Sequence, residues 1–116
     1  MKIKIVREKI SKNELEELAK DFYGFMIKGA IDIDREIVAF GGEYHIDANS
    51  VLIQEGSRQE NIWGFNIHIH KLKDLSDWLE YTSLINIRPN QENKTMKIQS
   101  EELRKKIKKI LEKMIE

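Results

Sequence analysis

The chain has 116 residues, of which 41% are hydrophobic and 34% are charged. That length suits one domain with a single hydrophobic core and is too short for two, so we expect one domain over residues 1–116. Twenty Lys and Arg balance twenty Asp and Glu, which leaves no net field to attract the protein to nucleic acid or to an anionic membrane.

The chain contains no Cys. A disulfide framework, a thiolate zinc site and a cysteine nucleophile are therefore excluded, and the composition suits a reducing compartment. Residues 1–6 alternate charged and β-branched side chains and lack the continuous apolar run of a signal peptide or membrane span. We expect a cytoplasmic protein with no membrane partner.

Two elements are predicted before residue 25, a short strand and a helix. The strand covers residues 2–6, and its alternation places Ile3 and Ile5 on the inner face. Ser11 and Glu14 have the spacing of a capping box, in which each side chain accepts a hydrogen bond from a backbone N–H of the first helical turn. The helix that follows ends at Gly24. Its apolar face is formed by Leu15, Leu18, Ala19 and Phe22.

Segments rich in Ile and Val predict the strands in the middle of the chain. Residues 26–33 and 36–40 flank Asp34-Arg35 and are expected to form a hairpin, although its turn lacks the preferred Gly. Residues 62–70 alternate most regularly, which predicts a strand with one apolar and one polar face. The apolar face has Trp63, Phe65, Ile67 and Ile69, and the polar face has Gly64, Asn66, His68 and His70.

Short helices are predicted on either side of this strand. Asp47 is expected to cap the first, because its carboxylate can accept hydrogen bonds from the free amides of the opening turn, and Gly56 closes it. The second is indicated by apolar spacing after Asp74, at Leu75, Trp78 and Leu79.

The rest of the chain predicts a second hairpin and a long helix. The hairpin strands are residues 83–88, ended by Pro89, and residues 95–98, around a polar tip at residues 90–93. The helix begins at Ser100 and has one apolar stripe, formed by Leu103, Ile107, Ile110, Leu111 and Met114. We therefore expect an α+β fold of two layers, with one mainly antiparallel sheet of about five to six strands packed by two longer and two short helices.

The run from Gly41 to Asp47 holds the first candidate site. Its two glycines allow a tight turn or a close approach to a ligand, and Glu43 and His45 project to the same side if the strand continues past them. That spacing suits a general base and its orienting partner, as in a hydrolase. In the structural alternative, which is the more common outcome, the glycines form a bulge, Asp47 only caps a helix and His45 lies at the surface.

His68 and His70 form the second candidate. Alternate residues of a strand share a face, so the two imidazoles could chelate one zinc-like ion, with Glu43 or His45 completing the site. A His-x-His pair on a polar sheet face is also common by chance, and no third ligand follows at a diagnostic spacing. We therefore expect no metal, and the sequence leaves the cofactor undetermined.

Polar residues of the second hairpin are the third candidate. Arg88 offers a rigid fork for a carboxylate or phosphate, while the amides of Gln91 and Asn93 could bind a ligand or the loop's own backbone. If this hairpin lies beside the strand that carries Asn66 and His68, the sheet has one polar face open to a ligand. The basic residues of the last helix favour a solvated face, because a nucleic-acid-binding domain usually has a net positive charge.

Three runs of residues carry a resemblance to a known family. They are Gly41-Gly42-Glu43 with His45, Asp47 and Ala48; Glu55-Gly56-Ser57 with Gln59, Glu60, Trp63, Gly64 and Asn66; and Ser83-Leu84-Ile85-Asn86 with Arg88, Pro89, Gln91 and Asn93. On these runs the whole chain resembles a family of small uncharacterised bacterial and archaeal proteins, a domain of unknown function.

The resemblance implies no activity, cofactor or partner. It implies that a site shared by the family, if there is one, involves Glu43, His45, Asp47, Gln59, Asn66, Arg88, Gln91 and Asn93. It also counts against the metal site, because relatives tend to have an aromatic-proline pair in place of His68-Ile69.

The sequence therefore favours a binding or accessory module, expected as a homodimer, that uses the polar sheet face and the hairpin loops. Its ligand, a small molecule or a nucleic acid, is not identified by the residues. Hairpins with polar tips are frequent recognition surfaces, and no phosphate loop or dinucleotide fingerprint occurs. The alternative is a small hydrolase, such as a nuclease, in which Glu43 and His45 act as acid and base and Arg88 holds phosphate. Nucleic-acid binding without catalysis, through the last helix, is a third hypothesis.

Overall fold

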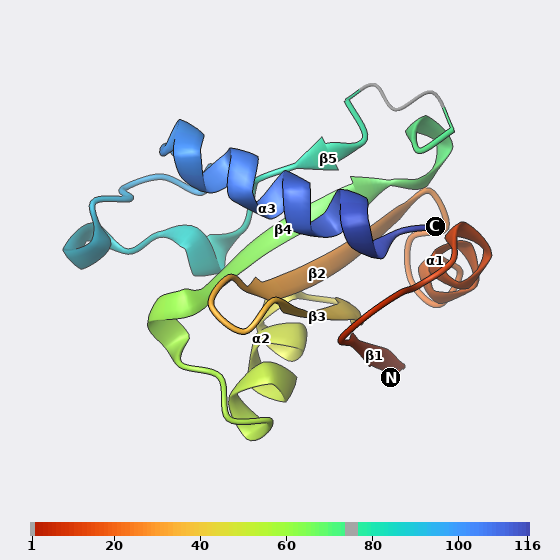
Figure 1. Ribbon diagram of the computed structural model, residues 1–116, viewed down its shortest axis with the longest axis horizontal. Helices are drawn as coiled ribbons and strands as arrows, with labels where there is room; N and C mark the ends of the chain where they lie inside the picture. Colours follow the sequence, from red (N-terminus) through yellow and green to blue (C-terminus); the bar gives the residue numbers. More distant parts are fainter. Residues whose placement is uncertain (1, 74–76) are drawn as a thin grey trace.

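The computed structural model describes residues 2–73 and 77–116. One sheet contains β1 (Ile3–Val6), β2 (Met26–Asp32), β3 (Ile37–Gly41), β4 (Ile62–His68) and β5 (Leu79–Glu80). Its strand order is β1-β3-β2-β4-β5, and every pairing is antiparallel (Figure 1). The α-helices are α1 (Lys12–Ala19), α2 (His45–Gln54) and α3 (Glu101–Met114). The predicted α+β class with a single antiparallel sheet is confirmed.

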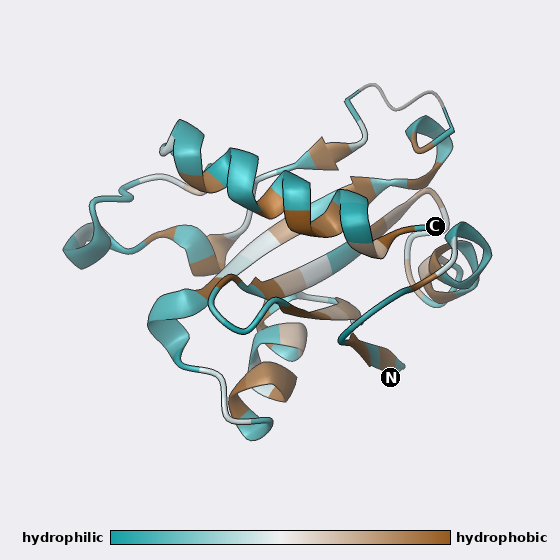
Figure 2. Cartoon of the chain, in the orientation of Figure 1, coloured by the Kyte–Doolittle hydropathy of each residue, from teal (hydrophilic) through white to brown (hydrophobic). Residues whose placement is uncertain are grey.

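A large apolar core lies between one face of the sheet and the helices α1 and α3. Alternate strand residues point to the same side, so Phe40, Phe65 and Ile67 all enter this core. Gly29 makes room for the ring of Phe65, with which a Cβ at this position would collide. Helix α3 carries alternating hydrophilic and hydrophobic bands (Figure 2), and its buried residues are Ile107, Ile110, Leu111 and Met114, as its apolar stripe predicts.

A smaller core lies on the opposite face, where α2 packs over β2 and β3 (Figure 1). Small side chains from the two strands, Ala30 and Ala39, meet Ala48 and Leu52 of the helix. The predicted two-layer packing thus describes the larger core, and α2 covers part of the second face. The part of that face beside α2 is where the candidate site lies.

Local capping chemistry sets the helix starts and the first hairpin. The Ser11 Oγ accepts a hydrogen bond from the Glu14 N–H at 3.1 Å, and the Ser100 Oγ accepts one from the Leu103 N–H at 3.2 Å. In the turn between β2 and β3, the Asp32 carboxylate accepts hydrogen bonds from the N–H groups of Asp34, at 2.9 Å, and Arg35, at 3.0 Å. Glu36 adopts the left-handed conformation there, with φ 56°. An Asp turn therefore replaces the missing Gly.

Two predictions near the C-terminal half are wrong. Leu79 does not lie in a helix, because it pairs with Ile67 as part of β5; Asp74 and Leu75 of the same prediction lie outside the described residues. Residues 83–98 do not form a two-stranded hairpin. They contain two short 3₁₀ helices, Leu84–Asn86 and Pro89–Gln91, and the chain around them pairs only at two isolated bridges, Thr82 with Lys97 and Arg88 with Asn93. The side chains of two asparagines in this segment take over backbone hydrogen bonds that a strand would have made.

Phe22 is also placed differently from the prediction. Helix α1 ends at Ala19, before the fourth predicted apolar position is reached, so the ring of Phe22 is 42% exposed. The chain then turns through Gly24, whose φ of +74° favours glycine, and enters β2.

Candidate binding site

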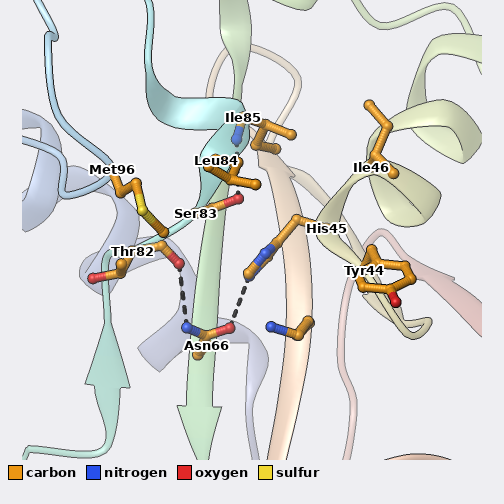
Figure 3. Close-up of a pocket in the computed structure, with 10 residues that line it drawn as sticks. Tyr44, His45, Ile46, Asn66, Thr82, Ser83, Leu84, Ile85 and Met96 are labelled. Carbon is orange, nitrogen blue, oxygen red and sulfur yellow. Dashed lines mark hydrogen bonds between the residues drawn. The ribbon is translucent and has the colours of Figure 1, made fainter.

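A recess of about 340 Å³ opens on the α2 side of the sheet, between the start of α2 and residues 82–85 (Figure 3). Its polar part is formed by Lys28, His45, Asn66, Thr82 and Ser83. Its apolar part is formed by Tyr44, Ile46, Leu84, Ile85 and Met96. We call this cavity the His45 recess.

His45 reaches the recess because the chain leaves the sheet directly after β3. Gly41 and Gly42 have φ values of +113° and +92°, a conformation that side-chain-bearing residues rarely adopt. The strand therefore ends at Gly41, and His45 is the first residue of α2. The strand does not continue past Gly41, so the condition under which Glu43 and His45 would share a strand face is not met.

Asp47 stabilises the start of α2, though from a different position than predicted. The N-cap residue is Tyr44, and Asp47 lies three residues later, where its carboxylate accepts a hydrogen bond from the Tyr44 N–H at 3.1 Å. Glu43 precedes the helix with its side chain exposed, and its backbone carbonyl accepts a hydrogen bond from the Tyr23 hydroxyl at 2.6 Å. Both residues hold the loop that presents His45.

The imidazole of His45 is buried and oriented by two acceptors. Its Nε2 lies 2.8 Å from the Asn66 Oδ1 and 3.0 Å from the Phe65 carbonyl oxygen. Because both partners can only accept, Nε2 carries the proton. Nδ1 makes no hydrogen bond to any residue in the described part of the chain and is not among its buried unpaired atoms, so its lone pair is accessible to solvent or a ligand.

The surroundings keep His45 neutral. Burial lowers the pKa of His45 below its ordinary value of 6.5, and the positive charge of Lys28 lowers it further. The hydrogen bonds to Asn66 and Phe65 act in the opposite direction and do not cancel these effects. At neutral pH the ring is therefore an acceptor at Nδ1 and a donor at Nε2.

A polar row across three strands positions the imidazole. In the sheet register Asn66 lies directly between Lys28 of β2 and Glu80 of β5. The Asn66 Nδ2 donates to the Glu80 Oε1 at 2.7 Å and to the Thr82 carbonyl at 3.2 Å, so its Oδ1 must point toward His45 (Figure 3). Asn66 is consequently a positioning residue for the ring.

The predicted open polar face is mostly closed. Asn66 is only 5% exposed, and Gly64 beside it lies so close to Ser83 that a Cβ would contact that side chain at 2.6 Å. His68 is partly covered and lies 3.6 Å from the Glu80 carboxylate. The face is covered because residues 82–86 fold back over it, and it is accessible at the His45 recess.

Arg88 and Gln91 lie outside the recess and bind backbone. The Arg88 guanidinium donates to the carbonyls of Gln59, at 2.6 Å, and Ile62, and it stacks over the Trp63 ring with 3.8 Å to the ring centroid. The Gln91 Nε2 donates to the Glu60 carbonyl at 2.9 Å. These two side chains hold the backbone of residues 59–62, the segment that leads into β4.

The remaining predicted amides are likewise engaged within the protein. Gln59 and Asn49 exchange two side-chain hydrogen bonds of 2.9 and 2.7 Å. The Asn93 Nδ2 donates to three backbone carbonyls, the closest being that of Asn86 at 2.7 Å. Of the eight residues predicted as a shared site, the structure therefore brings His45 and Asn66 together in the recess.

Sequence reasoning missed Lys28 and the role of Asn86. Lys28 lies between Ile27 and Gly29, which face the larger core, so the alternation of the strand predicts that Lys28 faces the opposite side of the sheet. Its position opposite Asn66 depends on strand register, which the alternation does not specify. Asn86 stands between Ile85 and Ile87, and a polar residue in such an apolar run is a signal for a buried hydrogen-bonding role.

The described residues contain no group of three or more His, Asp or Glu that is placed to hold a metal ion. His70 lies beyond the end of β4, in the short helix Ile69–Lys71, so it does not share a strand face with His68 as predicted. Within the same part of the chain, no helix has the length and apolar character needed to cross a membrane.

A known family covers nearly the whole chain. Residues 4–114 match the family described as Protein of unknown function (DUF5674). The chain belongs to this family. No curated protein and no solved structure matches the chain. The expected membership in a domain family of unknown function is confirmed, and the family brings no ligand or activity to the His45 recess.

The lowered pKa of His45 predicts a pH dependence of stability. Because the folded pKa lies below 6.5, the unfolded chain binds the proton first as the pH falls. The stabilising contribution is therefore complete above that value and is lost as the pH falls through the folded pKa. We expect the free energy of unfolding of the wild type to fall over this acidic window relative to that of His45→Gln.

Urea unfolding of both proteins at several pH values measures this difference, and NMR titration of the ring gives the folded pKa directly. A ring that titrates at or above 6.5 would contradict the burial argument. A His70→Gln variant is the control, because that ring is exposed and lies outside the recess.

Proposed function

We propose that this protein is a binding module whose ligand site is the His45 recess. The observation that supports it is the unpaired Nδ1 of a buried, neutral imidazole that lines a partly apolar cavity and is held there by two hydrogen bonds. Small-molecule sites combine apolar lining with a few polar groups that fix orientation. A ligand that donates a hydrogen bond to Nδ1 would satisfy the acceptor that the protein leaves free.

The distribution of exposed apolar side chains supports the same location. Eight large apolar side chains are exposed among the described residues, and four of them line this recess. They are Tyr44, Ile46, Leu84 and Met96, with exposed fractions of 60%, 53%, 70% and 41%. Because exposed apolar side chains gathered around a cavity are characteristic of binding surfaces, we assign these four residues to the ligand contact.

The hydrolase alternative gains less support. Glu43 and Arg88 do not line the His45 recess, and the Arg88 guanidinium is already bound to two backbone carbonyls. A phosphate held by His45 would therefore lack the proposed Arg contact. The homodimer and the cytoplasmic location stay predictions; a dimer formed through the recess would cover Tyr44 and Leu84 and would compete with ligand binding.

Replacing His45 with Gln tests the proposed function. The Gln amide can keep an N–H close to the position of Nε2, which preserves the contact to Asn66, but it provides no acceptor at the position of Nδ1. With phenols, indoles and short-chain alcohols as probes, we expect saturable NMR shifts of the wild-type amides of residues 44–46 and 82–85. The variant should bind these probes about tenfold more weakly.

The exposed His70→Gln substitution is the matched control and should bind like the wild type. Shifts that map to another part of the surface, or equal affinities of wild type and His45→Gln, would refute the proposal. Circular dichroism and the dispersion of the amide spectrum establish that each variant remains folded.

A further inference from the structure

We propose that the ligand of the His45 recess is a carboxylate with an apolar body and a hydroxyl or amide N–H near its carboxylate group. This inference rests on the proposed function, because it names the chemical class that the same cavity would accept. Three features of the recess carry it: its charge, the free amides at the start of α2, and the Nδ1 of His45.

The charge of the recess favours an anion. Lys28 is a lining residue, and none of the other lining residues is acidic. Lys28 lies opposite Asn66 in the sheet, which brings its side chain to the polar part of the cavity. It makes no ion pair with any described residue, and its ammonium lies 5.2 Å from the centroid of the Tyr23 ring.

Glu80 does not neutralise Lys28. Glu80 lies on the far side of Asn66, where one oxygen accepts the Asn66 amide and the other lies 3.6 Å from His68. Lys28 therefore lines the recess without a counter-charge from another lining residue. An anionic group of the ligand would supply one.

The start of α2 adds donors at the same edge. Tyr44 provides no side-chain cap, and the N–H groups of His45 and Ile46 make no hydrogen bond within the described chain. The first amides of a helix favour a negative group through the helix dipole. Independently of the helix end, His45 is only 9% exposed and its Nδ1 has no partner among the described residues.

The other contacts define the rest of the ligand. Nδ1 of the neutral imidazole can only accept, so the ligand must offer an O–H or N–H at that point. The apolar side chains of Tyr44, Ile46, Leu84 and Met96 would cover a hydrocarbon body. A cavity of about 340 Å³ is at the small end of ligand sites, which favours a medium-length chain.

Three matched compounds test this assignment: 3-hydroxyoctanoate, octanoate, which lacks the hydroxyl, and methyl 3-hydroxyoctanoate, which lacks the charge. By NMR titration at neutral pH, we expect 3-hydroxyoctanoate to shift the amides of residues 44–46 and 82–85. Octanoate and the methyl ester should each bind about tenfold more weakly.

Two variants assign each loss to one side chain. In Lys28→Met the preference for the acid over its ester should disappear, whereas in His45→Gln the preference for the hydroxylated acid over octanoate should disappear. Lys108→Met removes an exposed charge of α3 outside the recess and should behave like the wild type.

The outcomes separate this inference from the proposed function. Equal binding of the acid and the ester, or binding of the neutral phenols and indoles without binding of the acid, would overturn the carboxylate assignment and leave the binding module intact. If neither set of compounds shifts the recess amides, both proposals are wrong.

Discussion

Replacing Asn86 with Ala is expected to lower the free energy of unfolding by about 3 kcal/mol. Asn86 is fully buried, and its Oδ1 accepts a hydrogen bond from the Gly64 N–H at 2.8 Å. Its Nδ2 donates to the carbonyls of Gly64, at 3.0 Å, and Met96, at 3.2 Å. The substitution would leave these buried backbone groups without partners, and each such group costs about 1 to 3 kcal/mol.

The position of Asn86 explains why no other residue can compensate. Strand β5 pairs with β4 only at Asn66 and Ile67, so Gly64 has no strand partner on that side. The Asn86 amide provides both a donor and an acceptor there, as a strand residue would. Loss of this side chain therefore interrupts the hydrogen bonding of β4 next to the His45 recess.

Urea unfolding followed by tryptophan fluorescence measures the change. Asn90→Ala is the matched control, because Asn90 is exposed and the expected change is within about 0.5 kcal/mol. Asn86→Asp should cost at least as much as Asn86→Ala, because it keeps the acceptor but places a buried carboxylate oxygen against the carbonyls of Gly64 and Met96. A cost for Asn86→Ala as small as that of the control would show that the backbone finds other partners.

Replacing Arg88 with Ala is expected to cost about 2 kcal/mol of stability, without a loss of binding in the His45 recess. The guanidinium holds the carbonyls of Gln59 and Ile62 and packs on the Trp63 ring. Arg88→Lys should recover part of this stability, because an ammonium cannot reproduce the planar fork that serves two carbonyls and stacks on an indole.

Melting temperatures of the wild type and these variants, measured with and without phosphate, decide between a structural and a phosphate-binding Arg88. In the structural interpretation, millimolar phosphate does not raise the melting temperature of the wild type relative to Arg88→Ala. Arg58→Ala is the control, because its side chain is 77% exposed and its ion pair with Glu60 is a surface contact of little energetic value. A phosphate-dependent stabilisation that disappears in Arg88→Ala would restore the hydrolase hypothesis.

Much of the fold could be predicted from local patterns. The alternation of β1 and β4, the N-caps of Ser11 and Ser100 and the apolar stripe of α3 depend on residues a few positions apart. Such patterns are set by the 2.0- and 3.6-residue periods of strand and helix, which do not depend on distant partners. The hairpin of β2 and β3 was predictable for the same reason.

Residues 83–98 were mispredicted because their apolar alternation has another cause. Leu84 and Ile87 are exposed, while Asn86 between them is buried to serve Gly64. Among residues 84–87, the buried residue is thus the polar one. Asn86 is buried because the backbone of β4 at Gly64 has no strand partner on that side, and Gly64 is distant from Asn86 in the sequence.

Local sequence patterns predict the α+β class, the starts of α1 and α3, and the two residue types that matter in the recess, His45 and Asn66. The folded arrangement of the chain brings these two together, places Lys28 opposite Asn66 and directs Arg88 to backbone instead of a ligand. Periodicity indicates which side chains are buried. Which buried polar groups face one another depends on strand register and on long-range packing, and no local pattern specifies either.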